Sequence, residues 1–127
     1  MREIIFRGKR IDNGEWVEGF VYCFYNFTKR VTQILRDRTN GIPDAVEVIL
    51  ETVGQFTGLT DSNGDKIFEG DIVECAREDE SLMVMWCEDT ARFILSASTF
   101  CCDFDNYWGY EMEVIGNIHD NPELFGG

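Results

Sequence analysis

The sequence predicts a compact, mostly β domain, and three observations support this fold class. Short stretches in which apolar and polar residues alternate recur along the chain, as they do in half-buried strands. No window shows a convincing i, i+3, i+4, i+7 apolar spacing of an amphipathic helix. Apolar residues make up 44% and aromatic residues 13% of the 127 positions, so we expect one aromatic-rich core that needs neither metal nor disulfide.

The N-terminal third indicates a β-hairpin. Apolar side chains alternate with cations from Ile4 to Lys9, and a longer apolar stretch runs from Trp16 to Tyr25. Asn13-Gly14, between the two stretches, is the preferred pair for a two-residue type I′ turn. Both alternating sets of the second stretch are largely apolar, which predicts a central strand.

Residues 26–44 are weakly patterned, and we expect a mobile or partner-ordered segment there. Three apolar residues within 31–35 have the spacing of a helical stripe, so a short helix and an irregular strand are both open for that stretch. Apolar side chains then stand at every second position from Val46 to Leu50, which predicts a strand with one solvated face.

Residues 53–77 combine turn residues with single apolar anchors. Residues 61, 63 and 65 have the spacing of calcium ligands, but an EF-hand loop would place Gly and Glu where Lys66 and Ile72 stand. We therefore predict a hairpin tip at Asn63-Gly64 and no metal site. Five residues suit tight corners built from positive-φ glycines and backbone-bonded aspartates, with a binding loop as the alternative. These candidates are Gly58, Asp61, Gly64, Gly70 and Asp71.

Residues 57–73 read T-G-L-T-D-S-N-G-D-K-I-F-E-G-D-I-V, which resembles the core motif of the YopX family, T-G-L-x-D-x-x-G-x-x-I-[YF]-E-G-D-[IV]-V. F-R-G-K at 6–9, V-M-W at 84–86 and the segment 114–124 are also similar to that family. The resemblance implies a phage or prophage protein, mostly β, without an assigned biochemical role, and it transfers no catalytic residue. We expect one YopX-like domain over 1–127, with an N-terminal β region (1–52) and a C-terminal region (53–127).

From Gly70 onward the chain resembles a small SH3-like barrel, in which a G-D-x-V turn leads into successive short strands. We expect strands over 72–76, 82–86, 92–95 and 110–116, separated by acidic turns. Asn121 as N-cap and Pro122 at the first helical position predict one short helical turn near the C-terminus.

The formal charge of −13 is distributed unevenly. Residues 1–38 hold eight of the Lys and Arg residues and five acids, for a net +3, whereas the remainder holds three cations and 19 acids, for a net −16. This balance disfavours direct nucleic-acid binding, because a polyanion is repelled at long range. The acidic excess is explained most simply by solubility. Head-to-tail pairing of copies into a homo-oligomer and mimicry of a nucleic-acid backbone are the alternatives.

The five cysteines form no C-x-x-C pair and are an odd number, so we predict reduced, mostly buried thiols that act as small hydrophobes, and no zinc site or disulfide framework. The role of the adjacent Cys101 and Cys102 is open. His119 is the single histidine, and we expect it to cap or pack.

No catalytic, cofactor-binding or metal-binding residue is predicted. The sequence lacks a nucleophile beside a base at recognisable spacing, a P-loop and a dinucleotide fingerprint. Acid pairs such as Glu69 with Asp71 and Asp103 with Asp105 leave a carboxylate-based hydrolase as an alternative.

Residues 97–109 combine aromatic and acidic side chains, and their order is open. Phe104, Tyr107 and Trp108 are candidate protein contacts, because Tyr and Trp are enriched at interaction hot spots; filling the core is the alternative. The longest apolar run, residues 21–25, is too short to span a bilayer, and charges throughout residues 1–20 argue against a secretory signal. We therefore expect a non-enzymatic accessory protein of the bacterial cytoplasm that binds another protein or itself. An acidic inhibitor of a DNA-binding protein is the alternative.

Overall fold

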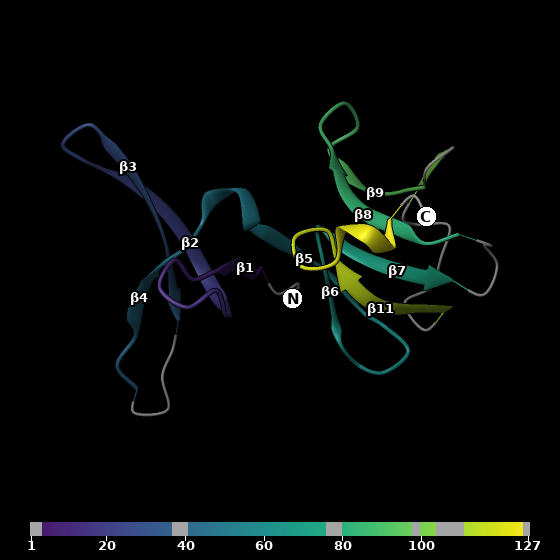
Figure 1. Ribbon diagram of the computed structural model, residues 1–127, viewed down its shortest axis with the longest axis horizontal. Helices are drawn as coiled ribbons and strands as arrows, with labels where there is room; N and C mark the ends of the chain where they lie inside the picture. The colour runs from purple at the N-terminus through teal and green to yellow at the C-terminus, as the bar shows by residue number, and fades with distance from the viewer. Residues whose placement is uncertain (1–3, 37–40, 76–79, 98–99, 104–110, 126–127) are drawn as a thin grey trace. The chain divides into compact units, whose positions relative to one another are not determined.

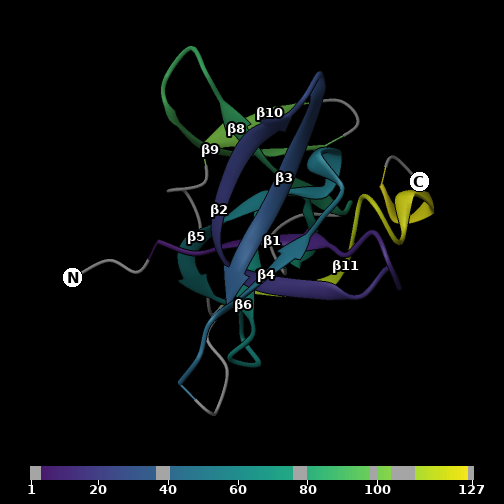
Figure 2. The ribbon, with the colours of Figure 1, turned by 90° about the vertical axis from the view of Figure 1, so that its left-hand side faces the viewer.

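The computed structural model describes residues 4–36, 41–75, 80–97, 100–103 and 111–125, with the backbone alone for Cys102 and Asp103. The predicted fold class is confirmed: the described residues form antiparallel strands in two sheets, with two short 3-10 helices (Figure 1). The longest strands, β2 (Trp16–Asn26) and β3 (Lys29–Arg36), run side by side as a ribbon (Figure 2). Among the described helices, none has the length and apolarity that crossing a membrane requires.

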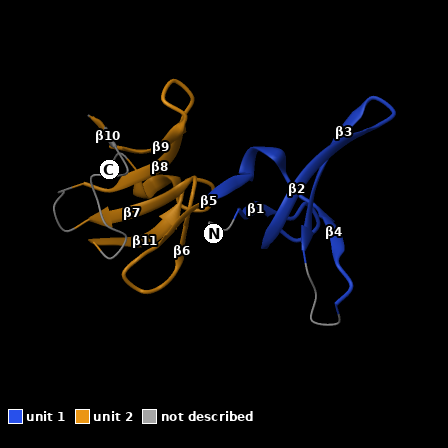
Figure 3. Ribbon diagram, turned by 180° about the vertical axis from the view of Figure 1, so that it is seen from behind, with its two compact units in different colours: residues 1–56 blue, residues 57–127 orange. Residues whose placement is uncertain are grey.

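The chain divides into two compact units, residues 1–56 (unit 1) and residues 57–127 (unit 2) (Figure 3). The sequence suggested one domain with a subdivision between residues 52 and 53. The observed division falls four residues later, inside β5 (Gly54–Thr60). Each unit has its own cluster of buried side chains.

In unit 1 the strand order is β4-β3-β2-β1-β5, where β1 is Phe6–Lys9 and β4 is Asp44–Glu47. The short helix η1 (Leu50–Thr52) leads into β5. The buried core of this unit is small, and Val21 and Val53 pack against it. Its buried members are Val17, Ile34, Val46 and Val48.

The first hairpin is confirmed, but its turn is not the expected two-residue turn. Pairing of β1 with β2 ends at Lys9 opposite Trp16, so a six-residue loop connects the strands. Gly14 has a φ of 73° whereas Asn13 keeps a negative φ, and the Asn13 side chain accepts a hydrogen bond from the Glu15 N–H at 2.9 Å. The local side-chain bond has replaced the type I′ geometry.

Residues 29–36 form β3, so the strand interpretation of 31–35 is correct and the helical one is wrong. Pairing with both β2 and β4 overrides the weak helical spacing, and it buries Val31 and Ile34. The expected strand over 46–50 is also shorter, since β4 ends at Glu47 and η1 follows. β2 and β3 approach so closely at Gly19 that a Cβ there would lie 2.1 Å from the Leu35 carbonyl oxygen, which only glycine avoids.

Unit 2 contains β6 (Lys66–Phe68) and a five-stranded sheet in the order β10-β9-β8-β7-β11. The strands are β7 (Asp71–Cys75), β8 (Leu82–Cys87), β9 (Arg92–Ser96), β10 (Cys101–Asp103) and β11 (Met112–Asn117). The four predicted strands match β7, β8, β9 and β11, whereas β10 was not predicted. As far as the described residues go, the sheet is open, with β10 and β11 at its edges.

One face of this sheet carries the core of unit 2. β6 is not part of the five-stranded sheet, because it is the neighbour of β5 in the six-stranded sheet β4-β3-β2-β1-β5-β6. It contributes Ile67 to the core and so covers that face. The buried cluster comprises Ile67, Val73, Cys75, Leu82, Val84, Leu95, Ala97 and Met112. Each fully buried aliphatic side chain of this kind contributes about 1.5–3 kcal/mol of transfer free energy, so this core is the larger source of hydrophobic stabilisation.

The predicted C-terminal helical turn is present as the 3-10 helix η4 (Pro122–Leu124), with Pro122 at its first position. We expected the Asn121 side chain to cap this helix, and that prediction is wrong, because its side chain makes no capping hydrogen bond. The Asn121 Oδ1 instead accepts a hydrogen bond from the Asn117 N–H at 3.4 Å. The side chain therefore joins η4 to the end of β11.

Candidate functional site

The corner residues predicted from the sequence stabilise turns in unit 2. The Asp61 carboxylate is 5% exposed; its Oδ1 accepts the N–H groups of Asn63 and Asp65, and its Oδ2 accepts that of Val114, each at 2.9 Å. Gly64, at the same turn, has a φ of 83°. Asp61 thus joins the β5–β6 turn to β11 through backbone hydrogen bonds.

Asp71 and the remaining two glycines form separate corners. Asp71 is buried, and its Oδ2 accepts the Phe68 N–H at 2.7 Å across the turn between β6 and β7. Gly58 and Gly70 both have a φ of 93°, which favours glycine. The described contacts give these residues roles in turn geometry, and Asp61 and Asp71 bond to different backbone segments.

The other residues singled out from the sequence divide between described and undescribed parts of the chain. His119 is exposed, and its N–H donates to the Asn117 side chain at 3.0 Å. Cys101 is an exposed free thiol that donates to Ser96 Oγ at 3.6 Å. Cys23 is also exposed, and among the described cysteines only Cys75 is buried, so the expected burial of the thiols is wrong. Phe104, Tyr107 and Trp108, the candidate protein contacts, and the side chain of Cys102 lie outside the described residues.

A different aromatic surface dominates the described part of the chain. We call residues 20–36, from the second half of β2 to the end of β3, the β2–β3 arm. Its large apolar side chains are exposed: Phe20 by 65%, Tyr25 by 71% and Phe27 by 97%. Tyr22, Phe24 and Leu35 are also exposed, and the Tyr22 and Phe24 rings stack with centroids 6.1 Å apart. Phe20, Tyr22, Phe24 and Leu35 share one face of the ribbon, whereas Tyr25 lies on the other. Exposed apolar side chains gathered on one face are typical of an interaction site.

Strand register explains why the arm exposes these rings. β1 pairs with β2 only from Trp16 to Gly19, and β4 pairs with β3 only from Gln33 to Arg36. Among the described strands, residues 24–26 and 29–31 therefore pair only with each other. Along the arm, Phe20, Tyr22 and Phe24 alternate with Val21 and so point away from the face that carries the core.

The end of the arm holds its most exposed ring in a costly backbone conformation. Asn26 pairs with Lys29, so Phe27 and Thr28 form the turn, and Phe27 has a φ of 59°. Glycine, Asn and Asp adopt this left-handed region easily, whereas a bulky residue there is a true outlier. Such outliers concentrate at functional sites. The backbone of Phe27 is strained and its ring is exposed, so the ring contributes nothing to the core.

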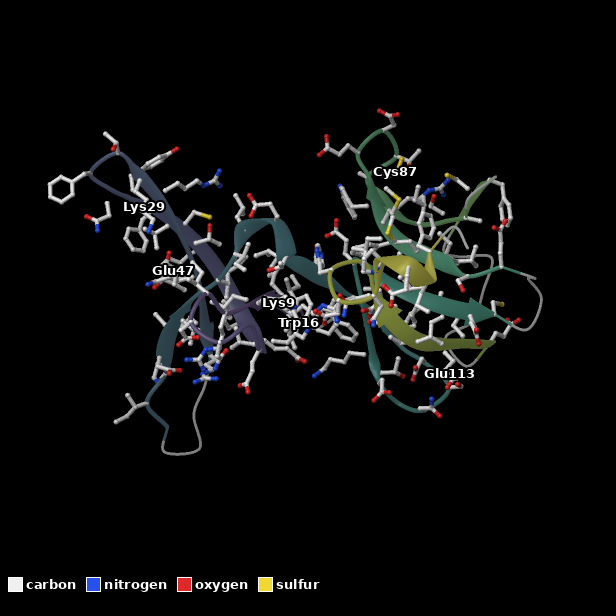
Figure 4. The ribbon with its side chains drawn as sticks, in the orientation of Figure 1. Lys9, Trp16, Lys29, Glu47, Cys87 and Glu113 are labelled. Carbon is white, nitrogen blue, oxygen red and sulfur yellow. The ribbon has the colours of Figure 1, made fainter. Side chains whose placement is uncertain are left out.

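The arm is also cationic. No carboxylate occurs between Glu18 and Asp37, whereas Lys29, Arg30 and Arg36 lie within that stretch. Lys29 Nζ lies 3.8 Å from Glu47 Oε2, but the Lys29 side chain is 72% exposed (Figure 4). An ion pair this exposed contributes at most about 1 kcal/mol, so Lys29 is easily recruited by another partner.

The opposite face of the arm carries an unusual thiol. Cys23 Sγ lies 3.5 Å from Thr32 Oγ1 and accepts a hydrogen bond from Arg30 Nη2, also at 3.5 Å. The bond with Thr32, followed by the bond with Arg30, lowers the pKa of the exposed Cys23 thiol. The arm therefore holds a thiol with increased thiolate character, which suits chemical labelling.

Unit 1 also contains an open polar cavity of about 260 Å³. Arg10 and Asp12 form an ion pair of 2.7 Å in it, and Asp44 pairs with Arg36 at 2.9 Å. Its lining residues are Arg10, Ile11, Asp12, Asp44, Ala45, Val46 and Glu47. The hydrogen bond from Arg10 lowers the pKa of Asp12, which is the opposite of what a general acid requires at neutral pH.

The fold and this surface define a two-unit, all-β protein with an exposed aromatic arm. A family model described as YopX protein matches residues 5–126, and the chain belongs to the YopX family. The chain is similar to the crystal structure of protein EF1440 from Enterococcus faecalis, with a TM-score of 0.54 and 24% sequence identity, over 98% of this chain and 99% of that chain. This likeness shows the fold. A comparison with curated proteins found no match.

We predict that Asp61→Asn lowers the free energy of unfolding by about 2–3 kcal/mol at pH 7, because one charge-assisted acceptor is lost. Burial raises the pKa of Asp61, but the N–H groups of Val114, Asp65, Asn63 and Gly64 together lower it. The carboxylate therefore stabilises the fold fully above its unfolded pKa of about 3.9, and the effect is lost as the pH falls through the lower folded pKa.

Urea unfolding at pH 7 and pH 3 measures this difference, which shrinks at pH 3. Asp65→Asn is the matched control, since Asp65 is exposed on the same turn and its replacement costs within about 0.5 kcal/mol. Equal losses for the two variants would contradict a special role for Asp61.

Phe27→Gly is predicted to raise the free energy of unfolding by about 1 kcal/mol, because glycine adopts the φ of residue 27 without strain. Phe27→Ala keeps the strain and removes the same ring, so its stability stays close to that of the wild type. Thermal and urea unfolding compare the three proteins. A destabilised Phe27→Gly variant would show that the ring supports the fold.

Proposed function

We propose that this protein acts without catalysis, by binding another protein or itself, and that the β2–β3 arm makes the contact. The observation that carries this proposal is Phe27, which is 97% exposed at a φ of 59°. A ring held at an energetic cost where it touches nothing in its own unit is accounted for by a partner that covers it.

The rest of the arm supports a protein partner. Aromatic side chains and Arg are enriched at the centres of protein interfaces, and both occur here on one ribbon. Trp16 offers a contrast within the same unit. Arg7 Cζ and Lys9 Nζ lie 4.5 and 5.7 Å from the centroid of its ring, so intrachain cations already cover it (Figure 4). By contrast, Phe20 and Phe27 of the arm are 65% and 97% exposed.

Family membership and composition indicate where and in what context the protein acts. We propose an accessory role in phage or prophage biology, exercised in the bacterial cytoplasm, as the YopX resemblance implies. We also propose that unit 2 is an open variant of a small SH3-like barrel. Its five short strands around one core, the first of which begins within the G-D-I-V segment at 70–73, support that relationship. In this scheme unit 2 is the folded support and the arm is the contact element.

The carboxylate-hydrolase alternative has weaker support. Asp71 is buried but bonded to a backbone N–H, and Asp12 and Asp44 are paired with arginines. Asp105 lies outside the described residues, as does the side chain of Asp103. A hydrolase needs one carboxyl whose pKa is raised, and Asp12 is shifted in the opposite direction.

Photocrosslinking tests the proposed function. With p-benzoylphenylalanine in place of Phe27, irradiation of cells that make the protein is expected to yield one discrete protein adduct. The same probe in place of Ile11, which is 54% exposed in unit 1 but lies outside the arm, is the matched control and yields none. Mass spectrometry identifies the adduct. No protein adduct from position 27, or equal adducts from both positions, would refute the arm as the contact element.

Acidic mimicry is a second candidate, because unit 2 holds 16 acids and three Lys or Arg residues. The same photoreactive residue in place of Glu113, on unit 2, is expected to capture a nucleic-acid-binding protein if mimicry operates. Capture from position 113 of a protein without nucleic-acid affinity would count against the mimic.

A further inference from the structure

We infer that the partner of the β2–β3 arm is unit 2 of a second copy of this chain, at the acidic face of β7 and β11. This inference rests on the proposed function and names its partner. Its first support is the separation of charge: unit 1 holds eight cations and eight acids, whereas unit 2 holds three cations and 16 acids. The whole net charge of −13 therefore lies on the unit that has no arm.

The acidic face has a specific feature that a cation would relieve. Glu74 in β7 and Glu113 in β11 are directly opposite each other in the antiparallel register, and both side chains are exposed. Like charges at opposed positions destabilise a sheet. Asn63 Nδ2 donates to Glu113 Oε1 at 3.5 Å, which brings a neutral donor and no positive charge (Figure 4). A lysine or arginine from outside the unit would convert this repulsion into attraction.

Two methionines of β8 lie on the same side of the sheet as these carboxylates. Val73 and Cys75 point into the core, so Glu74 points to the outer face, whereas Ile72, on the same side of β7, is fully buried. Met83 lies opposite Ile72 and is half-buried, and Met85, two residues further along β8 and farther from Glu74, is 37% exposed. Methionine adapts to irregular surfaces and makes favourable contacts with aromatic rings. The outer face thus offers both kinds of contact that the arm needs.

The end of the arm is arranged to present both kinds of group together. Phe27 is at the turn, and Lys29 and Arg30 follow it on opposite faces of the ribbon, because successive side chains of a strand alternate. An arm that docks end-on therefore places its ring between two cations. Pairing Lys29 and Arg30 with Glu74 and Glu113 brings Phe27 toward the methionines of the same face.

A second copy fits better than a nucleic acid. Aromatic rings and cations also suit single-stranded DNA or RNA. The arm, however, belongs to a chain with a net charge of −13, which repels a nucleic acid at long range. The same net charge opposes the approach of a second copy, but a second copy presents Glu74 and Glu113 to the cations of the arm, so its attraction is local. The contact joins two different surfaces, so it propagates from copy to copy until a ring or a reciprocal pair closes.

Charge reversal in the full chain tests the contact, with mass measured by light scattering after size exclusion at low ionic strength. Lys29→Glu/Arg30→Glu and Glu74→Lys/Glu113→Lys are each expected to weaken self-association by at least about 30-fold. An equimolar mixture of the two variants restores association, because each reversed arm then meets a reversed face and each native arm a native face. Salt at 1 M dissociates the wild type, since the Debye length falls to about 3 Å.

Glu88→Lys/Asp89→Lys is the matched control, because it changes the charge of unit 2 by the same amount on the β8–β9 turn. This variant keeps the wild-type association. Circular dichroism and urea unfolding confirm that each variant folds. Equal loss in the control, or no recovery in the mixture, would overturn the acidic face as the docking surface.

The outcomes separate this inference from the proposed function. A wild type that is monomeric at every salt concentration, with a Phe27-dependent adduct to a different protein, overturns the second copy and leaves protein binding through the arm intact. The second copy is also overturned if the wild type binds a fluorescent single-stranded oligonucleotide and Lys29→Glu/Arg30→Glu does not. A monomeric wild type without any protein adduct from position 27 refutes both.

Discussion

A β-sheet has two faces, and the buried core of unit 1 covers only one of them. Val17, Ile34 and their neighbours fill the inner face. On the other face of β2 and β3 Val31 is buried, but the small core leaves the large side chains of β2 exposed to solvent. Antiparallel sheets usually place polar residues on such a face. Here Phe20, Tyr22 and Phe24 stand there instead. The exposed aromatic arm follows from this one constraint.

Unit 2 solves the same problem differently. Its inner face is covered by Ile67 from β6, and its corners are fixed by Asp61 and Asp71 through bonds to backbone N–H groups. Hydrogen bonds from three backbone N–H groups offset most of the desolvation free energy of a buried carboxylate. The same bonds fix the backbone conformation of the corner. Unit 2 therefore has the larger core and the more firmly hydrogen-bonded turns, whereas unit 1 carries the exposed apolar surface.

Much of unit 2 could be predicted from the sequence, because apolar and polar residues alternate along its strands and acidic turns separate them. β7, β8, β9 and β11 all follow that pattern. Unit 1 was harder. β3 has apolar residues at positions 31, 34 and 35, a spacing that fits a helix as well as a strand, and only its pairing with β2 and β4 decides between them. The predicted type I′ turn at Asn13-Gly14 is wrong because the Asn13 side chain accepts a hydrogen bond from the nearby Glu15 N–H.

The candidate site was missed for a physical reason. Aromatic residues on both alternating sets of β2 indicate burial on two faces, and hydrophobic pattern alone does not say whether a cover is present. The signal that could have revealed the arm was the acid-free interval from residue 19 to residue 36, which is unusual in a chain with 24 acids. In the charge balance this interval is hidden within residues 1–38, whose net charge is only +3. The aromatic residues favoured instead, Phe104, Tyr107 and Trp108, lie outside the described structure.

The two-stranded end of the arm has a consequence for how this protein avoids aggregation. Residues 24–26 and 29–31 leave strand edges that no other described strand covers, and open edges with aromatic side chains can template cross-β stacking. Lys29 and Arg30 act there as gatekeepers, because identical arms that approach edge to edge bring like charges together. The same pair of cations that discourages stacking of arm upon arm leaves the approach of a negatively charged surface unhindered.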